Sequence, residues 1–265
     1  MNHITLDLYD LVLASVLVIF NGCLSFYLQL RLERQLLIAT LRMIVQLTLI
    51  GFVLKTLFAL SSPLWTGLMV LLMVLFAGRE IIARQERRLA GLWLYGLGTG
   101  CMLLATTVVT LFALTTQIQP DPWYDPRYAL PVLGMILGNI MSGISLGLYS
   151  LLNGAARERV AIEAQLMLGA TRWQATLPVT REALRNALMP IINAMAATGI
   201  VSFPGMMTGQ ILAGADPMEA VKYQMLILFL IAGGTAFGSV SAVVGGIYRL
   251  TDTRHRLRLE RLTNN

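Results

Sequence analysis

The stretch EAQLMLGATRWQATLP, from Glu163 to Pro178, is a polar segment set between two long apolar runs. Hydrophobic residues make up 56% of the 265 residues. Charged residues make up 13%, about half the share of an average soluble domain. The flanking runs are long enough to cross a lipid bilayer, which takes about 20 residues. The segment therefore predicts a loop between membrane-spanning helices.

The remaining runs extend this interpretation to the whole chain. We expect an all-α, polytopic membrane bundle that forms one domain over residues 1–265, because the apolar runs leave no room for a water-soluble domain. The first run follows acidic residues and lacks a small-residue cleavage site, so we expect a retained span and not a signal peptide. The seven predicted spans are 6–28, 36–60, 64–83, 92–114, 129–152, 188–212 and 223–248.

The basic residues predict the orientation. If the spans alternate, all 20 Lys and Arg residues except Lys55, Arg127 and Lys222 fall on one side. The positive-inside rule makes this side cytoplasmic, with the N-terminus outside and the C-terminus inside. The net charge of +6 thus reflects topology, and no nucleic-acid partner is expected. The arginine-rich segment 254–261 is expected to contact anionic lipid head groups, or a partner subunit.

Residues that could support catalysis are sparse. Cys23 and Cys101 lie inside predicted spans, and His3 and His255 are isolated near the termini. Neither of the two lysines stands in the Gly-Lys-Ser or Gly-Lys-Thr sequence of a Walker loop, so the chain is not expected to bind ATP in that way. We expect no catalytic residue and no cofactor bound by this chain.

Residues 153–187 have the form of a docking loop. One apolar helical face is predicted by residues at steps of three and four, namely Ile162, Leu166, Gly169, Trp173 and Leu177. Gly169 is expected to end the first helical stretch, and Pro178 to limit the next one. Such a face would be buried in a groove on another protein. The alternative is a helix that lies on the lipid surface.

The spacing in this loop resembles a known pattern. Glu-Ala, then Gly six residues after the Glu, then Leu-Pro after eight more resembles the cytoplasmic coupling loop of permeases of ATP-binding cassette (ABC) transporters. The later run FPGMMTGQILAGADP (203–217), the spans and the length resemble the FetB family of metal-export permeases over essentially the whole chain. Gln165 stands where the family usually has a second Ala.

The resemblance implies a function. We expect a permease of the bacterial inner membrane that exports a metal ion, iron by resemblance, and that is itself not an enzyme. It would act as a homodimer with two copies of a separate ATPase, which binds the ATP and Mg. The ATPase-coupling residues that the resemblance implies are Glu163, Ala164, Leu166, Gly169, Ala170, Trp173, Leu177 and Pro178.

A break in the sixth predicted span suggests a translocation route. Pro204 lacks the N–H that would continue the helix, and Gly205 follows at once, so the helix is expected to kink or break. Broken helices with polar atoms at membrane depth form substrate sites in many transporters. The candidates beside the break are Met206, Met207 and Gln210. An ordinary kinked membrane helix is the equal alternative.

The metal chemistry at these positions points in two directions. Met206 and Met207 are the candidate metal ligands, although thioethers suit soft ions such as Cu(I) better than ferrous iron. Arg42 and Gln46, one turn apart in the second span, are a further polar pair that could line the route. Arg42 could equally extend to the inner surface.

Glycines four residues apart predict close helix packing within one bundle, and the last pair, Gly234/Gly238, could equally serve a subunit interface. These pairs are Gly96/Gly100, Gly134/Gly138, Gly143/Gly147, Gly205/Gly209 and Gly234/Gly238.

Other transport classes remain open. An ABC importer would need a soluble binding protein outside, and the predicted outer loops are short, the longest near 117–128. A regulator built on an ABC fold would need a large outer domain. A secondary carrier or channel would leave the apolar loop without a groove. Plant relatives of the FetB family are linked with aluminium tolerance and sugar-nucleotide transport, so export of a non-metal solute is also possible.

Overall fold

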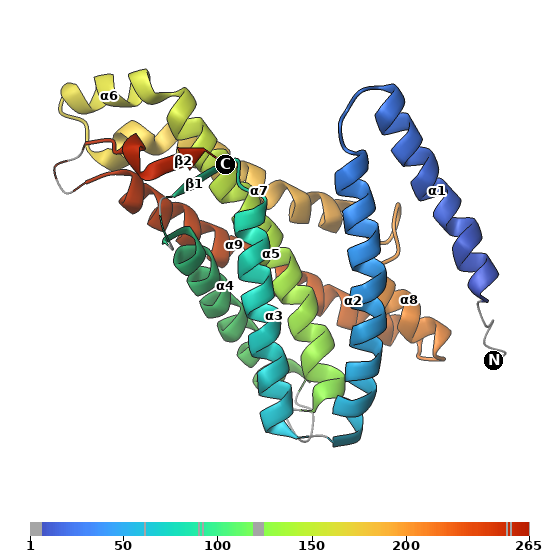
Figure 1. Ribbon diagram of the computed structural model, residues 1–265. Coiled ribbons are helices and arrows are strands. Elements are labelled where there is room, and N and C mark those ends of the chain that lie inside the picture. Colours follow the sequence, from blue (N-terminus) through green and yellow to red (C-terminus); the bar gives the residue numbers. More distant parts are fainter. Residues whose placement is uncertain are drawn as a thin grey trace. The chain divides into compact units, whose positions relative to one another are not determined.

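The computed structural model describes residues 7–60, 62–89, 91, 93–118, 125–252, 254 and 256–264 (Figure 1). The chain divides into two compact units, Met1–Leu60 and Ser61–Asn265. The helices of the first unit are α1 (Leu8–Tyr27) and α2 (Glu33–Leu60). The second unit contains α3 (Pro63–Ala83), β1 (Arg87–Leu89), α4 (Trp93–Phe112), the π-helical turn η1 (Ala113–Ile118), α5 (Pro126–Arg157), α6 (Arg159–Met167), α7 (Arg172–Ala197), α8 (Gly205–Leu212), α9 (Pro217–Leu250), the 3₁₀ turn η2 (Leu259–Arg261) and β2 (Leu262–Asn264).

The first unit is a helical hairpin. Its turn contains two residues with positive φ, Gln29 at 54° and Arg31 at 58°. The Ser25 hydroxyl closes the turn, because it accepts a hydrogen bond from the N–H of Leu32 at 3.1 Å and donates one to the Glu33 carboxylate at 3.3 Å. Most apolar side chains of both helices are exposed, because no other described residue of this unit covers them. In a membrane these side chains contact lipid or another protein.

α5 is the centre of the second unit and packs against α3, α4, α7 and α9. Its buried face repeats every four residues through Ile136, Ile140, Ile144 and Leu148, each with 0% exposure. This spacing places the four side chains along one side of the helix. The core of the second unit is therefore built around α5 and its longest partner, α9.

Glycines allow α5 and α9 to approach closely. A Cβ atom at Gly238 would lie 2.8 Å from Cγ2 of Ile140, and one at Gly143 would lie 2.8 Å from the hydroxyl of Ser239. The predicted packing role of the pairs Gly143/Gly147 and Gly234/Gly238 is confirmed. A Cβ at Gly96, Gly100, Gly205 or Gly209 would meet nothing within 4 Å. The pairs Gly96/Gly100 and Gly205/Gly209 therefore do not pack closely against a described helix of this chain, and for them the packing prediction is wrong.

Six helices are long and apolar enough to cross a membrane, among the residues that the structure describes. They are Tyr9–Tyr27, Glu33–Ala59, Pro63–Ala83, Trp93–Thr116, Pro126–Arg157 and Pro217–Leu250. The predicted all-helical membrane bundle is confirmed. The sixth predicted span, 188–212, is divided between the second half of α7 and α8. The seven-span topology, the placement of the termini and the single domain stay predictions, and the outer loop 117–128 lies largely outside the described residues.

The C-terminal segment folds back onto the helices, which the sequence did not predict. β2 pairs antiparallel with β1, the short strand between α3 and α4, with Arg88 opposite Thr263. Leu257, Leu259 and Leu262 pack against the core of the second unit. This small two-stranded sheet lies at the same end as α6 and the start of α7 (Figure 1).

Candidate functional site

The predicted docking loop is a sharp elbow between α6 and α7. Gly169 has a φ of +90°, which favours glycine. Its N–H donates to the carbonyl of Leu166 at 3.1 Å, and the N–H of Ala170 donates to the carbonyl of Gln165 at 3.0 Å. These two bonds form a Schellman motif, so α6 ends at the expected glycine.

A capping box begins α7 directly after the elbow. The N–H of Thr171 donates to the side-chain carbonyl of Gln174 at 2.9 Å, and the N–H of Gln174 donates to the Thr171 hydroxyl at 3.4 Å. A Thr followed three residues later by Gln is the sequence signature of this motif. The elbow is thus defined on both sides by local hydrogen bonds.

The α6 part of the predicted apolar face is directed toward this chain, whereas Trp173 and Leu177 on α7 are exposed. Ile162 is only 2% exposed, and Leu166 packs against the core. At the elbow itself, the most exposed apolar side chains are those of Met167, 83% exposed, and Leu168, 89% exposed. The sequence pattern did not single out either residue, because the predicted apolar face takes only positions at steps of three and four, from Ile162 to Leu177. A signal in the sequence was available, because Met167 and Leu168 are the two residues that directly precede the glycine expected to end the helix.

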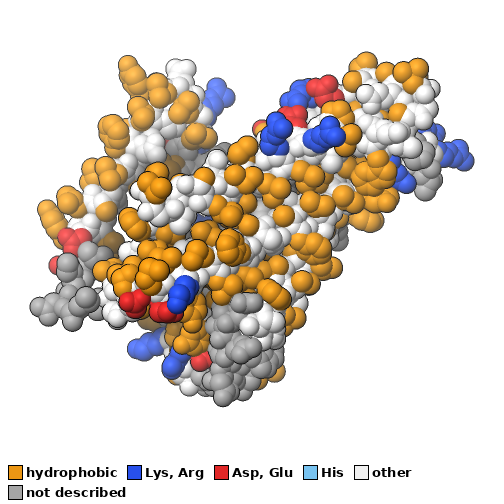
Figure 2. Space-filling model, turned by 180° about the vertical axis from the view of Figure 1, so that it is seen from behind, with side chains coloured by type: hydrophobic (Ala, Val, Ile, Leu, Met, Phe, Trp, Pro, Cys, Tyr) orange, Lys and Arg blue, Asp and Glu red, His pale blue; other side chains and the backbone are white. Residues whose placement is uncertain are grey.

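The other predicted coupling residues surround this elbow. Glu163 forms an ion pair with Arg159 at 2.9 Å, and Ala170 packs against the core. Ala164, Leu177 and Pro178 are exposed. The structure therefore gathers the predicted residues at one end of the second unit. Charged side chains also gather at this end, while hydrophobic side chains cover much of the body (Figure 2).

The expectation that Pro178 limits a helix is wrong, because α7 continues through Pro178 to Ala197. Proline removes one backbone hydrogen bond, here to the carbonyl of Gln174. The buried face of α7 outweighs this loss. A Cβ at Gly154 of α5 would lie 2.7 Å from Val179, so the two helices are in close contact immediately after the proline.

Aromatic and cationic contacts tie the start of α7 to the end of α9. The Trp173 ring meets the Tyr248 ring edge-on, with 5.3 Å between the centroids. The Arg172 guanidinium lies over the same Tyr248 ring at 4.7 Å. The neighbouring Arg249 lies over Trp93 of α4 at 4.8 Å. Such contacts are attractive when the cation lies over the ring face. The first two contacts connect the elbow to α9, and the third connects α9 to α4.

The predicted break at Pro204 is present. α7 ends at Ala197, and α8 begins only at Gly205, with Pro204 as its N-cap. Between them Gly199 has a φ of +91°, and its N–H donates to the carbonyl of Ser202 at 2.9 Å. The interruption is thus a structured loop of seven residues, and not a simple kink.

The candidate ligands after the break lie on the short helix α8. Met206, Met207 and Gln210 are each half-buried, and Met206 packs against the core. The side-chain oxygen of Gln210 is buried without a hydrogen-bond partner among the described residues. Met206 and Gln210 are four residues apart and share a helix face, whereas Met206 and Met207 do not face each other. A single ion could therefore be bound by Met206 and Gln210 together more readily than by Met206 and Met207 together.

Arg42 and Gln46 lie one turn apart on α2, and both are exposed within the first unit. Their predicted role in the route stays a prediction.

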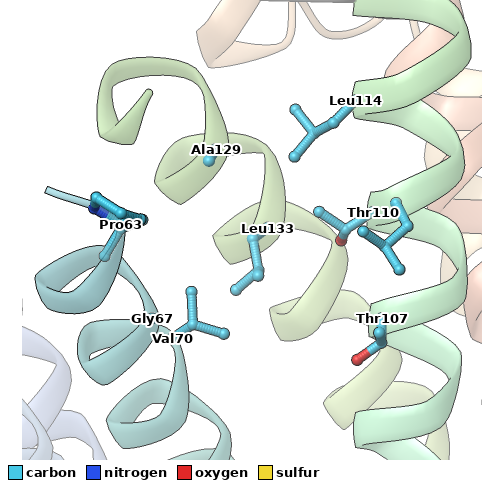
Figure 3. A pocket seen from close by; sticks show the side chains of 10 residues that line it. Pro63, Gly67, Val70, Thr107, Thr110, Leu114, Ala129 and Leu133 are labelled. Atoms are coloured by element: carbon cyan, nitrogen blue, oxygen red, sulfur yellow. The ribbon is translucent and has the colours of Figure 1, made fainter. Parts of the chain in front are cut away.

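A cavity of about 220 Å³ lies between α3, α4 and α5 (Figure 3). Val70 and Leu133 point into it, and its lining includes the threonines Thr66, Thr107 and Thr110. The Thr110 hydroxyl has no hydrogen-bond partner among the described residues. The lining has no carboxylate, imidazole or thioether, so it differs from the ligand set that transition metals prefer. None of the predicted site residues lines this cavity.

Groups of three or more His, Cys, Asp or Glu that could hold a metal are absent from the described part of the chain.

The fold defines a multi-pass helical membrane protein. The chain belongs to the family described as Uncharacterised protein family (UPF0014), whose model matches residues 8–251. A UPF0014 membrane protein of Synechocystis is 40% identical over 233 residues, 86% of each chain. The Probable iron export permease protein FetB of Escherichia coli K12 is 31% identical over 265 residues, 99% of each chain. The Protein ALUMINUM SENSITIVE 3 of Arabidopsis thaliana is 33% identical over 230 residues, 86% of this chain and 82% of that one. No solved structure matches the chain.

Proposed function

We propose that this chain is the permease subunit of an ABC transporter that exports a metal ion, iron in the first instance. A separate ATPase would supply the energy, and two copies of the chain would form the translocation unit. The observation that carries the proposal is the α6–α7 elbow, which presents Met167 and Leu168 at the charged end of the second unit.

Two exposed apolar side chains beside a positive-φ glycine suit a protein groove. Met167 and Leu168 extend from a turn held by a Schellman motif on one side and a capping box on the other. Because the turn is rigid, little conformational entropy is lost when it binds. Large apolar side chains that fill a pocket also dominate the free energy of most interfaces. The elbow is therefore preorganised for a partner.

The substrate class follows from the relatives by similarity. The Escherichia coli relative, similar over 99% of both chains, is named as a probable iron export permease. The Arabidopsis relative is named for aluminium sensitivity. Both names concern metal ions, and this supports a metal as the exported species.

The contacts of the elbow suggest how its movement would reach the bundle. Closure of the paired ATPases would move the elbow, and Arg172 and Trp173 would carry this movement to Tyr248 of α9. α9 and α5 pack through glycines, so the two helices would shift together. Such rearrangement of packed helices is the usual basis of alternating access.

Replacing Gly169 by Glu tests the docking assignment. A Cβ at this position meets nothing within 4 Å, so the free permease can accept the side chain, although the positive φ strains it. A charge forced into a desolvated groove is strongly unfavourable. We expect Gly169→Glu to abolish co-purification of the ATPase, while insertion in the membrane persists.

Gly214→Glu is the matched control for this test. Gly214 also has a positive φ, +95°, and open space around it, but it lies between α8 and α9 on the predicted outer side. It should retain the ATPase at the wild-type level. Normal assembly and substrate-stimulated ATP hydrolysis with Gly169→Glu would refute the docking assignment.

A further inference from the structure

One carboxylate, that of Asp252, joins several residues of the C-terminal segment 251–264 to one another. Asp252 accepts hydrogen bonds from the backbone N–H groups of Arg254 at 2.9 Å and Arg256 at 2.8 Å. Its carboxylate also forms ion pairs with the side chains of Arg256 at 2.9 Å and Arg258 at 3.2 Å. The side chains of Arg256 and Arg258 are thus paired with an acidic residue of the same segment. The segment is a folded element and not an extended basic tail.

This arrangement persists at physiological pH. The backbone N–H of Arg256 and the Arg256 guanidinium lower the pKa of Asp252 from 3.8 to about 2, against the opposing effect of desolvation. Because the pKa of Asp252 is lowered on folding, its charged form stabilises the folded segment at any pH above the ordinary pKa of an aspartate. This stabilisation is lost only as the pH falls from about 4 toward 2. Near neutral pH the carboxylate is charged and its contacts are intact.

A hollow of about 410 Å³ lies between this segment and α6. Its apolar lining comes from Leu166 and Met167 on α6 and from Leu257 on the C-terminal segment. Its charged lining consists of Glu163, Arg254 and Arg256. The hollow therefore combines apolar side chains with ionic groups, and the exposed Leu168 directly follows its lining residue Met167 in the sequence.

The ionic groups of the hollow are not equally available. Glu163 is paired with Arg159, and Arg256 is paired with Asp252. The backbone of Arg254 is bound by Asp252, but its exposed guanidinium has no partner among the described residues. The hollow thus offers one available cation next to apolar surface, which complements a carboxylate that neighbours an apolar side chain.

We propose that this hollow is a second docking site for the ATPase and receives an acidic side chain that pairs with Arg254. The inference rests on the proposed function, because the same α6 forms both the elbow and one wall of the hollow. A subunit that grips Met167 and Leu168 necessarily approaches Arg254. The family match ends at residue 251, so the family match does not imply this role of the C-terminal segment.

The test is the affinity of the detergent-solubilised permease for the purified ATPase that supports transport with the wild-type chain. Arg254→Glu should weaken binding about tenfold at low salt, because a repulsion between like charges replaces an attraction. Its contact with Asp252 uses only the backbone, so folding should be retained. Near 1 M salt, where the Debye length is about 3 Å, the difference should largely vanish.

Arg84→Glu is the control, because Arg84 is an exposed arginine at the end of α3 that lies outside the docking loop and does not line the hollow. It should bind the ATPase like the wild type. Unchanged binding by Arg254→Glu would overturn the inference, and so would an equal loss with Arg84→Glu. Unchanged ATPase binding with reduced binding to vesicles of anionic lipid would assign Arg254 to the membrane surface instead. If Arg254→Glu binds normally while Gly169→Glu does not, the proposed function stands without this second site.

Discussion

At the scale of single residues, the break before α8 separates two possible roles of the methionines. Leu replaces Met with little change of volume, and such core changes usually cost less than about 1.5 kcal/mol. Changing Met206 and Met207 together to Leu should therefore leave folding and ATPase assembly intact. Iron-stimulated ATP hydrolysis and iron efflux from vesicles should fall if thioethers contact the ion, with a larger loss for soft ions.

The two methionines are not equivalent in this prediction. Met206 shares a helix face with Gln210, so Met206→Leu alone should reproduce most of the loss. Met225→Leu, at an exposed position of α9, is the control and should transport normally. Full transport by the double variant would mean that the methionines only fill space. The route would then be sought elsewhere, first near Arg42 and Gln46.

At the scale of elements, one aromatic ring joins the start of α7 to the end of α9. Tyr248 receives both Trp173 and Arg172, so Tyr248→Leu removes an edge-on ring contact and a cation–π contact together. Each contact is worth about 0.5–1.5 kcal/mol. We expect the backbone amides of 159–176 to exchange hydrogen roughly tenfold faster, as a loss of about 1.4 kcal/mol implies.

Tyr248→Phe distinguishes the ring from its hydroxyl group. Phenylalanine retains the ring face and edge, so exchange in 159–176 should stay near the wild-type rate. Equal exchange in the wild type and in Tyr248→Leu would show that other contacts between α7 and α9 hold the elbow. Hydrogen–deuterium exchange with mass spectrometry resolves this segment from the membrane helices.

At the scale of the whole molecule, the distribution of basic residues predicts the orientation. Reporter fusions placed after Tyr128 and after Asn265 should show the first position outside and the second in the cytoplasm, since only Lys55, Arg127 and Lys222 fall on the predicted outer side. A periplasm-active enzyme and a cytoplasm-active fluorescent protein report the two sides. Finding both positions on one side would remove the seven-span topology.

Local sequence determined the elements that depend on composition and short-range bonding. Apolar runs of about 20 residues indicate membrane helices because lipid cannot satisfy backbone hydrogen bonds. Gly169 ends α6 as predicted, and the break at Pro204 is present, because both follow from backbone geometry. These features need no knowledge of distant contacts.

Tertiary structure decided which side of each element faces the protein. Helical spacing placed Ile162 and Leu166 on one face but could not show that this face packs inward and leaves Met167 and Leu168 free. Pro178 lies inside α7 because packing against α5 outweighs one missing hydrogen bond. The pairing of β2 with β1 joins residues about 175 positions apart, such as Arg88 and Thr263. Periodicity and composition act over a few turns, whereas burial and strand pairing depend on neighbours that only the folded chain brings together.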